Sequence, residues 1–131
     1  EFNPSNVEEV HLFQIWIMPD QAELTPSYEK VTLEKDGRKN KLQLVASNTR
    51  SEGKIFISQD VSFYLADLEK GTEIKLKIEK GRGVFLQTIS GELTVGNITL
   101  SKGDALEVTE ESELVIISNT DAELMLFDIK I

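Results

Sequence analysis

Residues 71–104 read GTEIKLKIEKGRGVFLQTISGELTVGNITLSKGD, a run of short apolar stretches separated by glycine-containing turns. Similar turn signals continue to Ile131, at intervals of about ten residues or less. Gly96-Asn97 is suited to a two-residue hairpin turn, because both residues tolerate positive φ. Short strands at regular spacing indicate an all-β sandwich or barrel. No segment shows a sustained helical period, so we expect low helix content.

The pattern predicts strands along most of the chain. These are Ile74–Ile78, Val84–Ile89, Leu93–Val95, Ile98–Leu100, Ala105–Val108, Leu114–Ile117 and Leu124–Ile131, preceded by Lys41–Ala46 and a segment spanning Lys54–Leu68. Val10–Met18 (VHLFQIWIM) is nearly all apolar and ends at Pro19-Asp20, which favours a strand buried on both faces; a single helical turn is the alternative, because the run is too short for a long helix. Residues 20–40 are polar and contain turn formers, so they predict an extended connector.

Composition excludes several classes of function. The chain has 131 residues, the length of one domain, with no Cys and a single His. Disulfides, thiolate metal sites and multi-histidine sites within the chain are therefore excluded. A formal charge of −9 argues against a nucleic-acid partner. The sequence shows neither a membrane-spanning apolar stretch nor a secretory signal, and we expect a cytoplasmic protein.

Several stretches resemble the pirin-like bicupin family, which includes bacterial quercetinases. The residues that carry the resemblance are Glu1–Ser5, His11–Pro19, Leu24–Glu29, Gln59-Asp60 and Leu124–Asp128. The resemblance implies a cupin-type double-stranded β-helix barrel, antiparallel and jelly-roll-like. It also implies that residues 1–20 are the last strand and exit segment of a truncated N-terminal cupin. Residues 21–131 would then form a degenerate C-terminal cupin barrel.

In that family the metal site lies in the N-terminal cupin and uses three His and one Glu. The metal is a divalent transition ion such as Fe, Ni, Zn, Cu or Mn. Glu1 matches the family's Glu ligand, but its three His partners would precede residue 1. One carboxylate cannot hold a transition metal, which needs three or four converging ligands. We therefore expect Glu1 to be a solvated residue and the chain to bind no metal.

A second cupin could carry its own site, and counting along the chain tests this. Gly71 and Gly91 have the separation of the glycines that bracket the first cupin motif, and the count places Lys77, Glu79 and Val84 at ligand positions. Counting on from Gly103-Asp104 places Leu114 near the last one. These four degenerate positions contain no His, and Val and Leu cannot ligate.

The count also creates a conflict in register. It would turn Lys77 and Glu79 into the barrel and Ile74, Leu76 and Ile78 outward, and burying unpaired charge is costly. A shift of one residue would let Leu76 and Ile78 fill the interior. Alternatively, the three apolar residues pack against a partner sheet or another domain.

Other candidate features favour structural roles. His11 has no acidic or nucleophilic partner in the sequence, and the acidic clusters Glu8-Glu9 and Glu110–Glu113 are expected to be solvated. The basic patch Arg38–Lys41 is expected to be a solvated turn, and Lys80–Gly83 a turn without the helix that a phosphate loop needs. The aromatic residues expected in the core or at an interface are Trp16, Phe56, Phe63, Tyr64 and Phe85.

The sequence thus predicts a non-catalytic, metal-free C-terminal cupin of a pirin-like bicupin. Metal-dependent cleavage of flavonols such as quercetin would belong to the N-terminal cupin, the expected partner. Two alternatives stay open, a small-molecule binding module that uses the barrel cavity and an enzyme with an unrecognised site. We further expect Val10–Ile17 to join this chain's own sheet or to be exchanged with a second copy in a homodimer.

Overall fold

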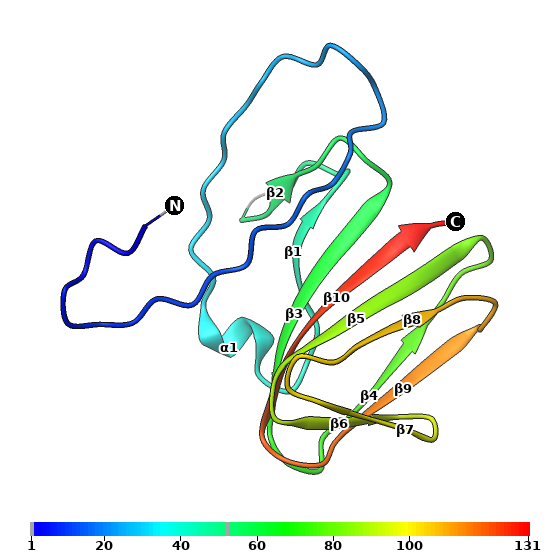
Figure 1. Ribbon diagram of the computed structural model, residues 1–131. Coiled ribbons are helices and arrows are strands. Elements are labelled where there is room, and N and C mark those ends of the chain that lie inside the picture. Colours follow the sequence, from blue (N-terminus) through cyan, green and yellow to red (C-terminus); the bar gives the residue numbers. More distant parts are fainter. Residues whose placement is uncertain (1, 52) are drawn as a thin grey trace.

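The computed structural model describes residues 2–51 and 53–131, which form two β-sheets around one apolar core (Figure 1). The elements are α1 Lys35–Arg38, β1 Gln43–Ser47, β2 Ile55–Phe56, β3 Val61–Leu68, β4 Glu73–Lys77, β5 Arg82–Ser90, β6 Glu92–Val95, β7 Ile98–Ser101, β8 Ala105–Val108, β9 Glu113–Ser118 and β10 Ala122–Lys130. The larger sheet has the order β2-β1-β3-β10-β5-β8, and the smaller has the order β4-β9-β6-β7. Strand pairing is antiparallel except between β1 and β2, which confirms the expected all-β class.

The core lies between the sheets because alternate residues of each strand point inward. On β10, for example, Leu124 and Leu126 are fully buried in the shared cluster, whereas Met125 and Phe127 belong to a second cluster on the other face. The largest fully buried aliphatic side chains of the core are Leu86, Leu93, Ile116, Leu124 and Leu126. The interior is thus filled by side chains from both sheets.

Gly91 lets the chain cross from the larger sheet to the smaller one between β5 and β6. Its φ is 75°, a conformation that residues with a Cβ rarely adopt. A Cβ atom at this position would lie 2.2 Å from the Asp121 carbonyl oxygen, so the corner also lacks room for one. The conformation and the close approach of residues 121–122 both require glycine here.

The predicted hairpin at Gly96-Asn97 is confirmed. It joins β6 to β7, with Val95 paired to Ile98, and Gly96 has a φ of 61°. The segment expected over Lys54–Leu68 divides into the short β2 and the eight-residue β3. The predicted low helix content is also confirmed, since α1 is a single four-residue turn. Within the two described ranges, no helix is long and apolar enough to cross a membrane.

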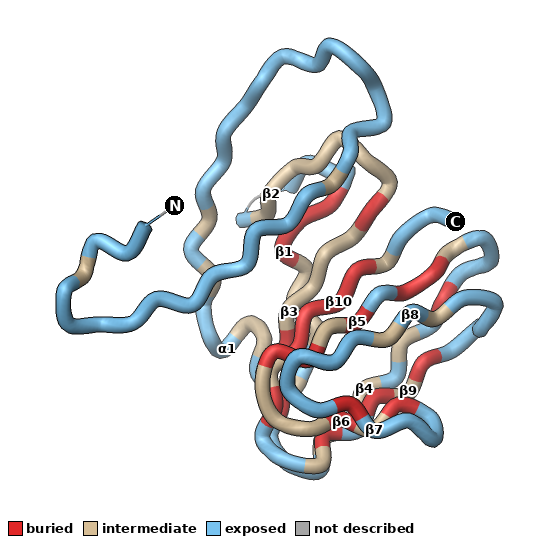
Figure 2. The backbone as a smooth tube through the Cα atoms, viewed as in Figure 1, coloured by how far each residue is buried: buried red, intermediate tan, exposed pale blue. Residues whose placement is uncertain are grey.

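The apolar segment Val10–Met18 departs from expectation. It forms no strand and runs as an extended segment outside both sheets (Figures 1 and 2). Trp16 is 86% exposed and Met18 is 79% exposed, so a strand buried on both faces is wrong for the described chain. The prediction that this segment joins the chain's own sheet is wrong as well. A buried strand needs a sheet edge to pair with and a layer to cover it, and this segment pairs with no edge strand of either sheet and leaves most of its side chains exposed.

Candidate functional site

The four degenerate ligand positions separate into two groups. Lys77 and Glu79 lie on the surface, where Lys77 Nζ is 2.9 Å from Glu79 Oε1 and the side chains are 79% and 67% exposed. The hydrogen bond and negative charge of Glu79 raise the pKa of Lys77. Both charges therefore sit in water, and the direct count, which turned them into the barrel, is wrong by one residue.

The shifted register is the one that the structure has. Leu76 and Ile74 pack against the core from β4, and Ile78 is buried within it. Burial of charge explains this choice, because the alternative would desolvate Lys77 and Glu79 and expose three aliphatic side chains. Packing of these apolar residues against a partner sheet is thereby excluded for β4.

Val84 and Leu114 lie inside the barrel, 1% and 5% exposed, within the same aliphatic cluster as Leu76 and Ile78. Side chains without lone pairs thus occupy the interior near these positions, and they do not fit a transition metal. Among residues 2–51 and 53–131, no group of three or more His, Cys, Asp or Glu side chains could hold a metal ion. Glu1, which matches the family's Glu ligand, lies outside the described residues.

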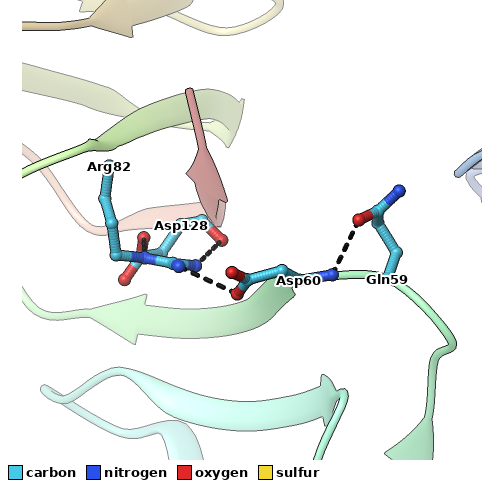
Figure 3. Close-up of polar contacts among 4 residues, drawn as sticks. All are labelled: Gln59, Asp60, Arg82 and Asp128. Carbon is cyan, nitrogen blue, oxygen red and sulfur yellow. Dashed lines mark hydrogen bonds and ion pairs between the residues drawn. The ribbon is translucent and has the colours of Figure 1, made fainter. Parts of the chain in front are cut away.

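A charged network stands at one end of the larger sheet, and the sequence analysis did not identify it. Arg82 opens β5, and its Nε donates to Asp128 Oδ1 at 2.5 Å (Figure 3). One guanidinium nitrogen donates to Asp60 Oδ1 at 2.8 Å and the other to the Asp128 carbonyl oxygen at 3.1 Å. Arg82 therefore connects the residue that precedes β3 with the C-terminal part of β10.

The electrostatics of this network favour a structural role. Burial alone would lower the pKa of the Arg82 guanidinium, but the hydrogen bonds and charges of Asp128 and Asp60 outweigh it and raise the pKa. Gln59 extends the network, because its Oε1 accepts from the Asp60 amide and its Nε2 donates to the Met18 carbonyl. The sequence signal available for this network was the family resemblance, because Gln59-Asp60 and Asp128 were among the residues that carried it. No such signal indicated a role for Arg82.

The basic patch Arg38–Lys41 is more than a solvated turn. Arg38 Nε donates to Asp67 Oδ2 at 2.9 Å, and Lys39 Nζ lies 2.9 Å from Glu69 Oε1. Asn40 Oδ1 accepts from the Glu69 amide at 2.8 Å. These contacts fasten the end of α1 and the turn after it to the end of β3. The expectation failed because the acidic partners lie 29 or 30 residues away in sequence.

The remaining candidates lie apart from one another. His11 is exposed, and its ring lies against the ring of Phe13 with 4.7 Å between the two centroids. Glu110–Glu113 is exposed, and Glu8-Glu9 likewise. The turn expected over Lys80–Gly83 is confined to Lys80-Gly81, because Arg82 and Gly83 already belong to β5. Phe56 lies 4.1 Å beneath the Arg50 guanidinium, and Trp16 is on the surface rather than in a core. Tyr64 packs against the barrel core, whereas Phe63 and Phe85 lie on the outer face of the larger sheet.

Comparison with known proteins decides the family. Residues 44–129 match the model of the quercetinase C-terminal cupin domain, which is more than half of the chain. The chain belongs to the pirin-like bicupin family. It is 35% identical over 129 residues to a quercetin 2,3-dioxygenase of Escherichia coli K12, a match that covers 98% of this chain and 54% of that protein. A putative quercetin 2,3-dioxygenase of Pasteurella multocida is 32% identical over 132 residues, with 98% and 55% covered.

Solved structures agree with this assignment to the pirin-like family. The crystal structure of YhhW from Escherichia coli superposes with a TM-score of 0.81 at 30% identity, covering 87% of this chain and 47% of that one. A second structure, the bacterial pirin YhhW in complex with nickel(II), has a TM-score of 0.77 at 29% identity, with 88% and 48% covered. The expected cupin fold is thus confirmed. This chain spans about half the length of the curated relatives it matches.

Proposed function

We propose that this chain is a metal-free, non-catalytic C-terminal cupin, comprising residues 21–131 with residues 1–20 as the end of a preceding cupin. One observation carries the proposal. The barrel interior, where a metal-binding cupin presents His and Glu, is filled by aliphatic side chains, with Val84 and Leu114 at two of the expected ligand positions. Deprotonated, converging ligands are a requirement for metal binding that these side chains cannot meet.

Any dioxygenase chemistry would then belong to another cupin of the same polypeptide. The relatives named as quercetin 2,3-dioxygenases are about twice as long as this chain, and the YhhW crystals hold nickel(II) in one case. A divalent transition metal would supply Lewis-acid or redox chemistry there. The role of this chain would be that of a scaffold in the cytoplasm, without a residue in the reaction unless Glu1 takes part.

The barrel cavity is a poor small-molecule site by comparison. Ligand pockets are concave, with a few converging polar groups among apolar ones. Here Leu86, Leu93, Ile116, Leu124 and Leu126 occupy the interior and are fully buried in one cluster. A ligand of drug size would have to displace this packing, at a cost that a few contacts would not offset.

Metal analysis of the purified 131-residue chain tests the proposal. The chain is expressed with Fe, Ni, Zn, Cu and Mn supplied in turn, dialysed, and analysed by mass spectrometry of the elements. We expect a substoichiometric content for each metal and no cleavage of quercetin above the rate in buffer. Stoichiometric metal that survives dialysis, or turnover of quercetin by this chain, would show that the proposal is wrong.

A matched variant tests whether any metal that the chain retains is bound at Glu1 or in the barrel. Glu1→Gln deletes the carboxylate that matches the family's Glu ligand and leaves the barrel untouched. If the wild-type chain retains metal and Glu1→Gln does not, the metal is held at the N-terminal residue rather than in the barrel. That result would contradict the metal-free claim while leaving the packed interior as described.

A further inference from the structure

A groove lies between β8 and β9, on the side of the barrel where the two sheets are not paired with each other (Figure 1). The larger sheet ends at β8, whose residues 105–108 form one wall. Residues 113–115 of β9 form the other wall and pair with β4 alone, because β6 ends at Val95, opposite Ile116. The groove has a volume of about 490 Å³. Two stretches of strand thus border one opening without pairing across it.

The backbone of β8 is unpaired along this edge. Residues 105–108 pair with residues 84–87 of β5, and within residues 2–51 and 53–131 they make no further backbone hydrogen bond. The sequence of β8, ALEV, contains neither proline nor lysine, which are common means of blocking a sheet edge. An unblocked edge accepts an extended segment of another chain as an additional strand. The open edge of β8 is therefore a template for a peptide strand.

The inner wall of the groove is apolar. Leu106 and Val108 are half-buried and pack against the core cluster, and Leu114 is 5% exposed. Val95 and Ile98 contribute from the β6–β7 hairpin, and Ile98 is 43% exposed. A strand added beside β8 would turn every second side chain toward this wall. The wall therefore selects apolar residues at alternate positions of a bound peptide.

The rim of the groove is acidic. Glu107, Glu111 and Glu113 border it and are exposed, and none of the described residues around the groove is Lys or Arg. No ion pair within the described ranges involves these three carboxylates. On an added strand, the side chains that point away from the apolar wall would lie beside Glu107, where opposite charges attract and like charges repel. The rim therefore selects Lys or Arg at the remaining positions.

We infer that the groove between β8 and β9 binds an extended peptide of another protein, in which apolar and basic residues alternate, as a strand added to β8. Backbone pairing would supply affinity, and the apolar wall and acidic rim would supply specificity. A second copy of this chain is disfavoured at β8, because the two acidic rims would repel each other. Small-molecule binding in the barrel interior is a separate matter, since the peptide would lie outside the packed core.

β4 provides an internal comparison. It is also an edge strand, but its Lys75 and Lys77 form ion pairs with Glu73 and Glu79, so this edge carries no excess of negative charge. A peptide that adds to any open edge would bind β4 and β8 alike. A peptide selected by the acidic groove would bind β8 alone.

Amide hydrogen exchange measured by NMR tests the site with a defined peptide. The peptide is acetyl-Val-Lys-Val-Lys-Val-Lys-Val-amide, titrated into the 131-residue chain at low ionic strength, where charge attraction is least screened. At saturation we expect exchange of the groove-facing amides among residues 105–108 to slow several-fold, while residues 73–77 of β4 keep their rates. Unchanged exchange in β8, or equal slowing in β4 and β8, would overturn the inference.

Two control peptides separate charge from backbone pairing. The alternating Val-Glu peptide keeps the strand pattern and reverses the charge. The fully N-methylated Val-Lys peptide keeps the charge but has no backbone N–H to donate. We expect neither to bind at concentrations that saturate the groove with the first peptide. Equal affinity of the Val-Glu peptide would show that the rim does not select, and equal affinity of the N-methylated peptide would show charge attraction without strand addition. Either result would contradict the proposed mode of binding.

Matched variants locate the charge that selects the peptide. Glu107→Lys reverses a carboxylate on β8, and Glu111→Lys does so in the loop after it, where no strand pairing is at risk. Glu9→Lys makes the same change in the exposed N-terminal segment, away from β8 (Figure 1). By fluorescence anisotropy of the labelled peptide, we expect each rim variant to weaken binding about fivefold and Glu9→Lys to weaken it less than about twofold. Equal effects of all three variants would contradict the site.

Other occupants of the groove give different results. If the 131-residue chain dimerises and the dimer protects β8 from exchange without peptide, the groove binds a second copy and the inference is wrong. The exchange experiment is repeated on the complete polypeptide that the gene encodes, where we expect the same slowing in β8. If the peptide has no effect there, another part of the polypeptide covers the groove, and the inference is again wrong.

Discussion

The outer faces of the two sheets differ although both sheets share one core. On the smaller sheet the outward positions of β4 are Glu73, Lys75 and Lys77, and ion pairs join Glu73 to Lys75 at 3.4 Å and Lys77 to Glu79 at 2.9 Å. On the larger sheet the corresponding positions carry aromatic and aliphatic side chains, centred on Phe127. The outer face of β4 is therefore charged and solvated, although β7 and β9 of the same sheet expose Ile98 and Ile117, whereas the outer face of the larger sheet is mainly apolar around Phe127.

This difference separates two kinds of stabilisation. Ion pairs between exposed side chains contribute little, because water and salt screen them. Apolar contacts contribute in proportion to the area that they remove from water. We therefore expect substitutions on the two faces to have unequal effects, and the following experiments rank them from the largest expected change to the smallest.

Truncation of Phe127 should cost most. Phe127→Ala removes a ring that is 8% exposed and stacked on Phe63, and we expect a loss of about 3 kcal/mol in the free energy of unfolding. Thr94→Ala on the smaller sheet removes one hydrogen-bonding group that Asn119 contacts, with an expected loss of about 1 kcal/mol. Urea unfolding of both variants checks the difference, and equal losses would contradict the contrast between the faces.

Two ion networks provide the next comparison. Arg82→Met leaves the carboxylates of Asp128 and Asp60 without their common partner in a part-buried site, and we expect a loss of about 1–3 kcal/mol. Lys77→Met breaks a pair that is mostly exposed, and its effect should lie near the limit of measurement. Unfolding titrations at low and high salt check both variants. A large loss in the free energy of unfolding for Lys77→Met would contradict this, because it would show that the exposed ion pair with Glu79 stabilises the fold.

Among the described residues, two buried side-chain oxygens lack a hydrogen-bond partner, Gln43 Oε1 and Thr88 Oγ1, and the second lies between the two sheets. Thr88 is 0% exposed, and its Oγ1 has no hydrogen-bond partner among the described residues. Thr88→Val keeps the branched shape and removes the hydroxyl, so we expect a gain of about 1 kcal/mol. Thermal unfolding would show this as a higher Tm. A destabilised Thr88→Val would indicate that the hydroxyl binds a buried water molecule.

The smallest effect is expected where α1 is fastened to β3. Hydrogen bonds from Lys39 and Asn40, together with the positive charge of Lys39, lower the pKa of Glu69. Because the folded pKa is lowered, this stabilisation is present above the ordinary pKa of Glu and is lost as pH falls through the folded pKa. Glu69→Gln should therefore be slightly less stable than wild type at neutral pH and equal to it in acid. Urea unfolding at the two pH values checks this, and a difference that persists in acid would contradict it.

Several strands could be predicted because turn residues and alternation are local signals. The hairpin at Gly96-Asn97 needs only its own two residues, and the prediction was correct. The placement of Val10–Met18 could not be predicted in this way, since an apolar run does not reveal which sheet edge or layer is available to it. The Arg82 network could not be predicted for a similar reason, because the partners of Arg82, Asp60 and Asp128, lie 22 and 46 residues away from it in sequence.

The sequence by itself determined the all-β class, most of the turns, the family, and the absence of histidine from the degenerate ligand positions. These follow from residue identity and short-range spacing, which no packing can change. The tertiary structure decided the register of β4, the attachment of Ile17 to the outer face of the larger sheet, and the stacking of Phe127 on Phe63. Alternation has a period of two and so leaves two possible faces for each strand. Only the free energy of burying Leu76 and Ile78 rather than Lys77 and Glu79 selects between them.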